Sequence, residues 1–362
     1  MKQLKIFLLI TSVFILALSC NNEELNSDDS STSGSSIDQT SLDVAQTSSQ
    51  LASGTSFRIS GSSTDSTSTT TDCKPGLNGA RHNRHKGILD GLNLLAPTDE
   101  LLAIVDAESA ADIRGLRISK NGGATITNYN ASGETVTIPF YLNDGPQGYS
   151  FSGHQFPLYD SLLTSIVKTE IDFGTGVTYK RDTVEITRAG KIIITRSKDG
   201  STITEVTTFD NYSVNDIKIE GTKTRISTYN SSTGSGSSTT SVTNGKITLK
   251  DGTVTEWKSD KSRVSAFTIS ESTGLPASGT ITTDVNTSVT ASDGTVIYAH
   301  KTTSSLIENI ACEGRRKAPV SGTLETIYRT DTLLIDFGDG TCTNKTITIT
   351  LNGVTSTKTI GD

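Results

Sequence analysis

The chain has 362 residues, a formal net charge of −7 and a pI near 5.2. This acidic balance argues against a nucleic-acid partner, because phosphate backbones are bound by clustered Lys and Arg side chains. Hydrophobic residues make up only 33% of the chain, largely because its N-terminal region is rich in Ser and Thr and its candidate strands are rich in Thr. Without an N-terminal export segment and a linker, roughly 290 residues remain, which is enough for one large or two small domains.

Residues 1–19 have the layout of a secretory signal peptide. Lys2 and Lys5 give a basic start, and a nearly unbroken apolar run follows from Ile6 to Leu18. This run is too short for a comfortable membrane span, which needs ~20 apolar residues. We therefore expect export from the cytoplasm and removal of this segment.

The signal peptide ends in Ala17, Leu18 and Ser19, which are followed by a single cysteine, Cys20. This pattern resembles the lipobox of bacterial lipoproteins. The resemblance implies that cleavage falls before Cys20, that its thiol takes a diacylglyceryl group, and that the new amine is acylated. Two or three acyl chains hold a protein durably on a bilayer, because each buried CH₂ contributes ~0.8 kcal/mol. The alternative is an ordinary signal peptide with an incidental cysteine.

An acidic stretch follows Cys20, with Glu23-Glu24 and then Asp28-Asp29. It resembles the acidic export tags of surface-exposed lipoproteins of Bacteroidetes-type bacteria, and Asn21 differs from the Asp of the best-known inner-membrane retention signal. We expect attachment to the outer membrane with exposure at the cell surface. The alternatives are a periplasm-facing protein and a plain solvated linker.

Residues 20–72 are dominated by Ser, Thr, Gly, Asp and Asn. Such a composition cannot bury enough apolar surface to fold, so we predict a disordered tether between the lipid and the folded part.

Residues 73–155 are predicted to form a small α+β module. A helix is expected near 99–113, because Thr98 can cap it, acids occupy its first turn and its apolar residues recur at helical spacing. Strands are expected at 124–129 and 135–141 around a turn at Ser132-Gly133. Cys73, His82 and His85 offer only three ligands in a basic stretch, so we expect no metal site there.

Residues 156–362 are predicted to form a large antiparallel β meander or sandwich, which makes the fold mainly β. Asp-Gly pairs at 199–200, 251–252, 293–294 and 339–340 separate runs that alternate apolar residues with Thr. Each pair suits a two-residue type I′ turn, in which both central residues need φ > 0. The alternation predicts a sheet buried on one face and wet on the other. A propeller is the less favoured alternative, because no side-chain signature repeats with the turns.

Three cysteines remain besides Cys20, and an oxidising compartment should pair two of them. Cys312 and Cys342 are the favoured pair, and closing their ~30-residue loop would stabilise the fold by about 3 kcal/mol. Cys73 would then be left over.

Several motifs in the C-terminal part occur in an order that resembles an uncharacterised lipoprotein family of Bacteroidetes, especially flavobacteria. The resemblance implies short strands joined by Asn-Gly and Asp-Gly turns, supports the pairing of Cys312 with Cys342, and implies no activity. The motifs are Asp210-Asn211-Tyr212, residues 215–222, Asn244-Gly245-Lys246 with Asp251-Gly252 and Trp257, Cys312 with Pro319-Val320-Ser321-Gly322, Asp336-Phe337-Gly338-Asp339-Gly340-Thr341-Cys342, and Asn352-Gly353.

No set of residues has the spacing of a known catalytic motif. The chain has four histidines, and none stands near a Gly-x-Ser-x-Gly sequence. We therefore expect no catalytic residues and no cofactor, and a lipid-anchored cell-envelope protein with a binding, adhesion or structural role. Its expected partners are the membrane, through the lipid, and a polysaccharide or protein ligand. The alternative is a surface hydrolase acting on polysaccharide, because its paired carboxylates would be matched in space and not in sequence.

Overall fold

A computed structural model gives the structure of the protein, and the residues that it describes lie within Ser36–Asp362. Cys20 and the helix expected near 99–113 lie outside the described residues. The structure describes residues 37, 39–53, 58–59, 123–137, 165–181, 184–230, 232–270, 276–312, 318–328 and 330–361.

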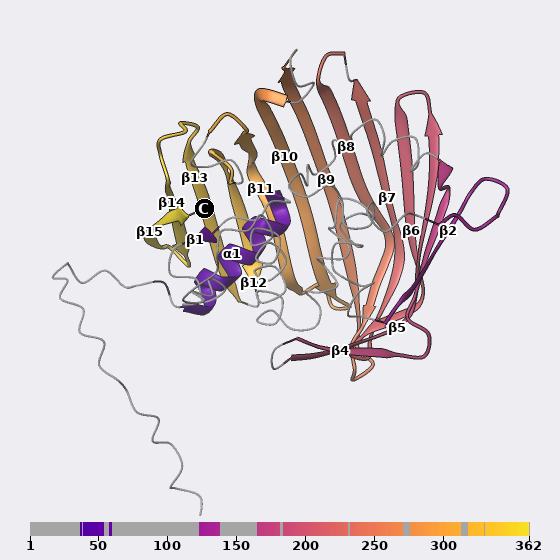
Figure 1. Cartoon of the computed structure of the whole chain (residues 1–362). Helices are drawn as coiled ribbons and strands as arrows, with labels where there is room; N and C mark the ends of the chain where they lie inside the picture. The colour runs from indigo at the N-terminus through magenta and orange to yellow at the C-terminus, as the bar shows by residue number, and fades with distance from the viewer. Residues whose placement is uncertain are drawn as a thin grey trace, which may run out of the picture. The chain divides into compact units, whose positions relative to one another are not determined.

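One antiparallel sheet of fifteen strands dominates the described part of the chain (Figure 1). From β5 to β15 each strand pairs with the next one in sequence, so this part is a continuous meander. The predicted mainly β, antiparallel fold is confirmed. The strands are β1 (Arg58–Ile59), β2 (Thr125–Tyr129), β3 (Lys168–Asp172), β4 (Val177–Arg181), β5 (Val184–Asp199), β6 (Thr202–Val214), β7 (Ile217–Asn230), β8 (Ser235–Thr248), β9 (Val254–Ile269), β10 (Pro276–Ala291), β11 (Val296–Asn309), β12 (Ser321–Tyr328), β13 (Asp331–Asp339), β14 (Thr346–Leu351) and β15 (Val354–Gly361).

The ends of the sheet are built from segments that are distant in sequence. β3 and β4 pair with the two halves of β5, and β2 pairs with β3. At the other end, β1 pairs with β15. The boundary predicted at residues 155–156 therefore does not separate two domains, because β2 and β3 share one sheet across it.

Burial alternates along the strands, as the side-chain period of two requires. In β9, Trp257 and Phe267 are buried, whereas Glu256 and Lys258, the two sequence neighbours of Trp257, are exposed. We call the side of the sheet that carries Trp257 the inner face and the opposite side the outer face.

The inner face carries two apolar clusters. The first spans β3 to β11 and the second lies on β10 to β15. Cluster 1 contains Ile171, Phe173, Ile192, Ile194, Tyr212, Val214, Ile217, Ile219, Ile247, Trp257, Val289 and Tyr298. Cluster 2 contains Ile37, Leu42, Val44, Ala45, Ala52, Val285, Leu306, Ala318, Leu324, Leu333, Ile335, Phe337, Ile347, Ile349 and Ile360.

A helix, α1 (Gln39–Ser53), packs against β10 to β13 and supplies part of cluster 2 (Figure 1). This corrects the prediction of a disordered tether over 20–72, which is wrong for residues 39–53 and for β1. Six of the fifteen helix residues are Ser or Thr, which lowers the helix propensity of the sequence. Burial of its few apolar side chains on the sheet outweighs that preference.

The Asp-Gly turns lie where the sequence places them, but the predicted type I′ geometry is wrong for the two best examples. At Asp251-Gly252 and Asp293-Gly294 only the glycine has positive φ. The N–H of Leu249 donates to the Thr253 carbonyl, so the loop between them has three residues with glycine in the left-handed position. A two-residue turn with two positive φ values occurs instead at Asn352-Gly353.

Two glycines, Gly221 on β7 and Gly245 on β8, leave room for Trp257, the one tryptophan of the chain. The Trp257 Nε1–H donates to the Glu220 carbonyl at 3.2 Å. A Cβ built on Gly245 would lie 2.8 Å from the indole Cδ2, and one on Gly221 would lie 2.8 Å from the Gly245 Cα. Both positions therefore need a residue without a side chain.

Gly245→Ala should destabilise the protein by about 1–3 kcal/mol, because the added methyl overlaps the Trp257 ring and backbone. The measurement is the midpoint of denaturant unfolding, followed by Trp fluorescence. Ser241→Ala, on the outer side of the same strand, is the control and should stay within about 0.5 kcal/mol of the wild type. Equal midpoints for the two variants would contradict this account of the glycine.

Candidate functional site

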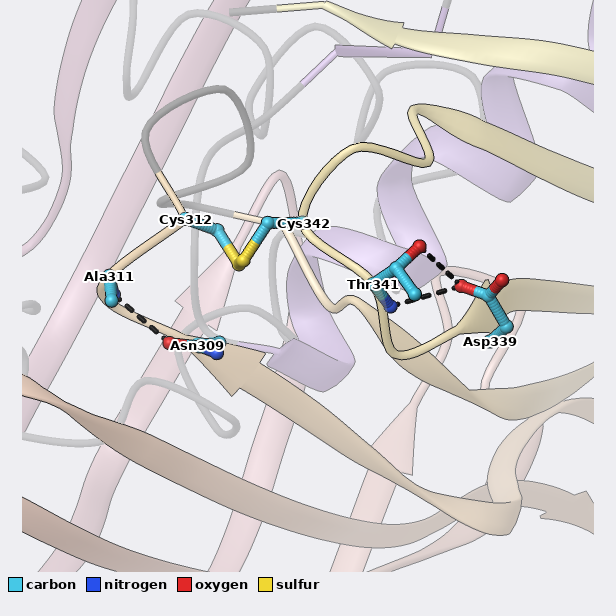
Figure 2. Close-up of a disulfide and its surroundings, with 6 residues drawn as sticks. All are labelled: Asn309, Ala311, Cys312, Asp339, Thr341 and Cys342. Carbon is cyan, nitrogen blue, oxygen red and sulfur yellow. Dashed lines mark hydrogen bonds between the residues drawn. A yellow bond between two sulfur atoms is a disulfide. The ribbon is translucent and has the colours of Figure 1, made fainter.

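The disulfide between Cys312 and Cys342 is present, with the two Cα atoms 5.0 Å apart (Figure 2). It joins the chain just after β11 to the loop that precedes β14. This confirms the predicted pair, and Cys73 lies outside the described residues. The bond closes a loop that contains the β12–β13 hairpin, so its role here is structural.

The turns beside this disulfide are held by side-chain oxygens. Asp339 Oδ1 accepts from the Thr341 N–H at 3.0 Å and from its hydroxyl at 2.7 Å (Figure 2). These bonds lower the pKa of Asp339, and the same Asp-Gly-Thr arrangement lowers the pKa of Asp251 and of Asp293 through the N–H groups of Thr253 and Thr295. The aspartates close turns, which is the ordinary role of such residues.

The histidines do not form a metal site in the part of the chain that the structure describes. His82, His85 and His154 lie outside that part, and His300 is buried on β11. Within the described ranges, no group of three or more His, Cys, Asp or Glu side chains could hold a metal ion.

His300 belongs to a polar contact between α1 and the sheet. Its Nδ1 lies 3.0 Å from the hydroxyl of Tyr298, which lies 3.3 Å from the hydroxyl of Ser48 on α1. All three side chains are buried. A buried polar group must be hydrogen-bonded to avoid a desolvation cost, so these bonds fix where the helix sits on the sheet.

An ion pair fixes the other end of α1. Arg263 on β9 donates through Nη1 to the carbonyl of Ser53, the last helix residue, at 3.2 Å. Its Nη2 lies 3.4 Å from Glu308 Oε1 on β11, and the two side chains are only 8% and 3% exposed. A guanidinium at a helix C-terminus satisfies a carbonyl that has no partner within the helix and matches the negative end of the helix dipole.

A second set of polar side chains crosses the inner face near the start of the meander. Arg196 on β5 donates through Nε to Glu205 on β6 at 2.8 Å, and Arg225 on β7 approaches the other oxygen of Glu205 at 3.4 Å. Arg196 also donates to Thr169 on β3, which donates to Asn128 on β2. The network thus links five neighbouring strands and carries one more positive than negative charge.

A third polar group lies inside cluster 1. The Arg188 guanidinium stands 5.9 Å from the Phe173 ring, and that ring lies 5.6 Å from the ring of Tyr212. Burial raises the pKa of Tyr212 to about 12, and the neighbouring guanidinium opposes this shift. Burial also lowers the pKa of Arg188. The tyrosine is therefore neutral at physiological pH and offers no base.

The outer face of β6 to β10 has a different character, because a region of it is uncharged and rich in hydroxyl groups. Two exposed aliphatic residues, Ile226 at 44% and Val264 at 54%, stand among these hydroxyls. Adjacent positions across the strands are Thr202, Thr228, Ser237, Val264 and Thr282 in one row and Thr204, Ile226, Thr239 and Ser262 in the next. We call these nine residues the hydroxyl patch.

Sequence reasoning missed both the inner polar set and the hydroxyl patch. The alternation of residues correctly predicts one buried and one solvent-exposed face of the sheet. It does not predict that the charged side chains of Lys261 and Arg263 lie on the buried face. The sequence does contain a signal for this burial. Lys261 and Arg263 share their face of β9 with Trp257 and Phe267, whereas the other face carries Glu256, Lys258 and Asp260.

Arg263→Met should destabilise the protein by about 3–5 kcal/mol, because the buried Glu308 carboxylate would lose the guanidinium with which it forms an ion pair. Hydrogen exchange should rise most in α1, which would lose the partner of its last carbonyl. Arg263→Met combined with Glu308→Leu should recover much of the loss, since both charges are then absent.

The control for this series is Lys301→Ala, which breaks an exposed ion pair with Glu325 and should cost no more than about 1 kcal/mol. Unchanged exchange in α1 after Arg263→Met would contradict the proposed fixing of the helix.

Comparison with other proteins gives no further identification. No helix among the described residues is long and apolar enough to span a membrane. No protein-family model, no curated protein and no solved structure matches the chain.

Proposed function

We propose that the chain is a lipid-anchored protein of the bacterial cell envelope with a non-catalytic binding role, and that the hydroxyl patch is its binding surface. The proposal places it in the outer membrane, held through Cys20 and exposed at the cell surface. The ligand that best suits the patch is a neutral polysaccharide.

The anchor rests on the N-terminal sequence. The basic start, the apolar run from Ile6 to Leu18 and the small residues before Cys20 agree with one another in order and spacing. The acidic residues that follow Cys20 support surface exposure. The same sequence features underlie the proposed kinship with Bacteroidetes lipoproteins.

The binding surface rests on the chemistry of the hydroxyl patch, which is the observation that carries this proposal. None of its nine side chains is charged, and the charged residues that border it across the strands are Asp284 on β10, beside Ser262, and Asp199 on β5, beside Thr202. Neighbouring strands lie ~4.8 Å apart and side chains on one face of a strand repeat every ~6.7 Å, so the patch offers a regular array of donors and acceptors. Ile226 and Val264 add apolar contacts for the C–H faces of sugar rings.

The anchor is tested in the native host by Cys20→Ala. We expect the wild type to fractionate with membranes and to take up a fatty-acid label, and the variant to lose both, because the acyl chains are attached at this residue. A variant that still fractionates with membranes would refute the lipid anchor.

The binding surface is tested by Thr239→Lys in the protein without its signal peptide, against insoluble cellulose, chitin and β-glucan. A lysine in the centre of the patch should weaken retention on the bound polysaccharide at least tenfold, equivalent to ~1.4 kcal/mol. Thr357→Lys, on the exposed outer side of β15, is the matched control and should bind like the wild type. A wild type retained on none of these polymers, or equal loss in both variants, would sink the proposal.

A further inference from the structure

The polar network on the inner face of β5 to β7 is short of negative charge. Arg196 and Arg225 share one carboxylate, that of Glu205, and each guanidinium approaches a different oxygen of it. The side chains of Arg196, Arg225 and Glu205 are 12%, 11% and 15% exposed. Charges that are mostly withdrawn from solvent are screened less than charges on an open surface, so the surplus positive charge of this network favours a bound anion.

Arg225 is the member of the network whose hydrogen bonds are incomplete. A guanidinium has five N–H donors in a fixed plane. In the part of the chain that the structure describes, Arg225 donates through Nη1 to Glu205 at 3.4 Å, and its Nε is buried without a partner. A buried donor without an acceptor costs free energy, so this side chain has room for a further acceptor.

The unused donors of Arg225 lie on the edge of the guanidinium that suits a carboxylate. The Nε–H group and one N–H group of Nη2 are parallel, and together they match the two oxygens of a carboxylate. Glu205 is bound through Nη1 and leaves this edge open. Of the two nitrogens on the edge only Nε is fully buried, so solvent reaches the edge at Nη2.

The neighbouring groups on this face include two threonines that add no charge. Thr240 on β8 is the direct cross-strand partner of Arg225, and Thr207 follows Glu205 by two residues on the same face of β6. Both are 7% exposed. A threonine hydroxyl can donate to an anion. The surplus of one positive charge and the planar edge of Arg225 both fit a carboxylate, which is a planar monoanion.

We propose that Arg225, with Arg196 and Thr240 beside it, forms a binding site for one carboxylate group on the inner face of the sheet. The carboxylate binds the Nε–Nη2 edge of Arg225, while Glu205 holds the guanidinium from its other side. The carboxylate belongs to a small free organic acid or to a uronic acid unit of a sugar chain. The site and the hydroxyl patch lie on opposite faces, so this inference stands independently of the proposed function.

The test uses the protein without its signal peptide, with acetate and tri-galacturonate as probes and sodium chloride at equal ionic strength as the reference. In the wild type at least one probe should raise the unfolding temperature saturably, because a ligand that binds only the folded state stabilises it. The same probe should shift the NMR signal of the Arg225 Nε–H group in protein with isotope-labelled arginine. A response to acetate indicates a site for free carboxylates, and a response to tri-galacturonate alone indicates a site for a uronate unit.

Two variants should change the affinity in opposite directions. Arg225→Gln should weaken binding of the probe at least tenfold, equivalent to ~1.4 kcal/mol, because the bidentate edge is lost. Glu205→Gln should strengthen it severalfold, because the competing carboxylate is removed. Lys218→Gln is the matched control, since it removes an exposed cation of β7 that pairs with Glu220 on the outer face, and it should bind like the wild type.

The wild-type readings require no substitution and decide the proposal even if Arg225→Gln fails to fold. A wild type that responds to neither probe, or an Arg225 signal that stays in place while the unfolding temperature rises, would overturn the proposal. Equal affinities of the wild type and Arg225→Gln, or of the wild type and Glu205→Gln, would overturn it as well.

Discussion

A sheet of one layer cannot bury its own apolar side, and most of the structure follows from that constraint. Every strand from β5 to β15 turns alternate side chains to the same inner face. A sandwich would cover this face with a second sheet. Here the described cover of cluster 2 is α1, a helix from the far N-terminal side of the chain. The fold therefore depends on segments outside the meander, and the polar contacts under α1 show how such a segment is held in one position.

In the contact between α1 and the sheet, the apolar and polar groups have different roles. The apolar residues of α1 supply burial, which has little directional preference. Arg263 and Tyr298 add direction, because a hydrogen bond to the Ser53 carbonyl and one to the Ser48 hydroxyl can form at only one placement of the helix. The same division recurs near β5, where the Arg196–Glu205–Arg225 set sits beside the apolar residues of cluster 1.

Local sequence signals were enough to predict the class of fold, whereas the features that depend on long-range contacts could not be predicted from the sequence. Turn residues and alternation located most strands, since both act within a few residues. The prediction of a type I′ turn at Asp251-Gly252 was wrong because the loop there has three residues instead of two. The sequence alone does not show which residues of the two strands pair at the ends of the loop. α1 was missed because its stability comes from a surface more than two hundred residues away. The buried Lys261 was missed because alternation shows that two faces differ without showing how each is covered, and the hydroxyl patch exists only once the register of five strands is known.

The distance in sequence between α1 and its binding surface also sets the order in which the fold can form. The chain is synthesised from its N-terminus, so α1 is complete long before β10 to β13. The helix has no surface to bind until those strands are made, and β1 has no partner until β15, the last of the described strands, has been made. Assembly of this end of the sheet is thus delayed until synthesis of the described part is almost finished.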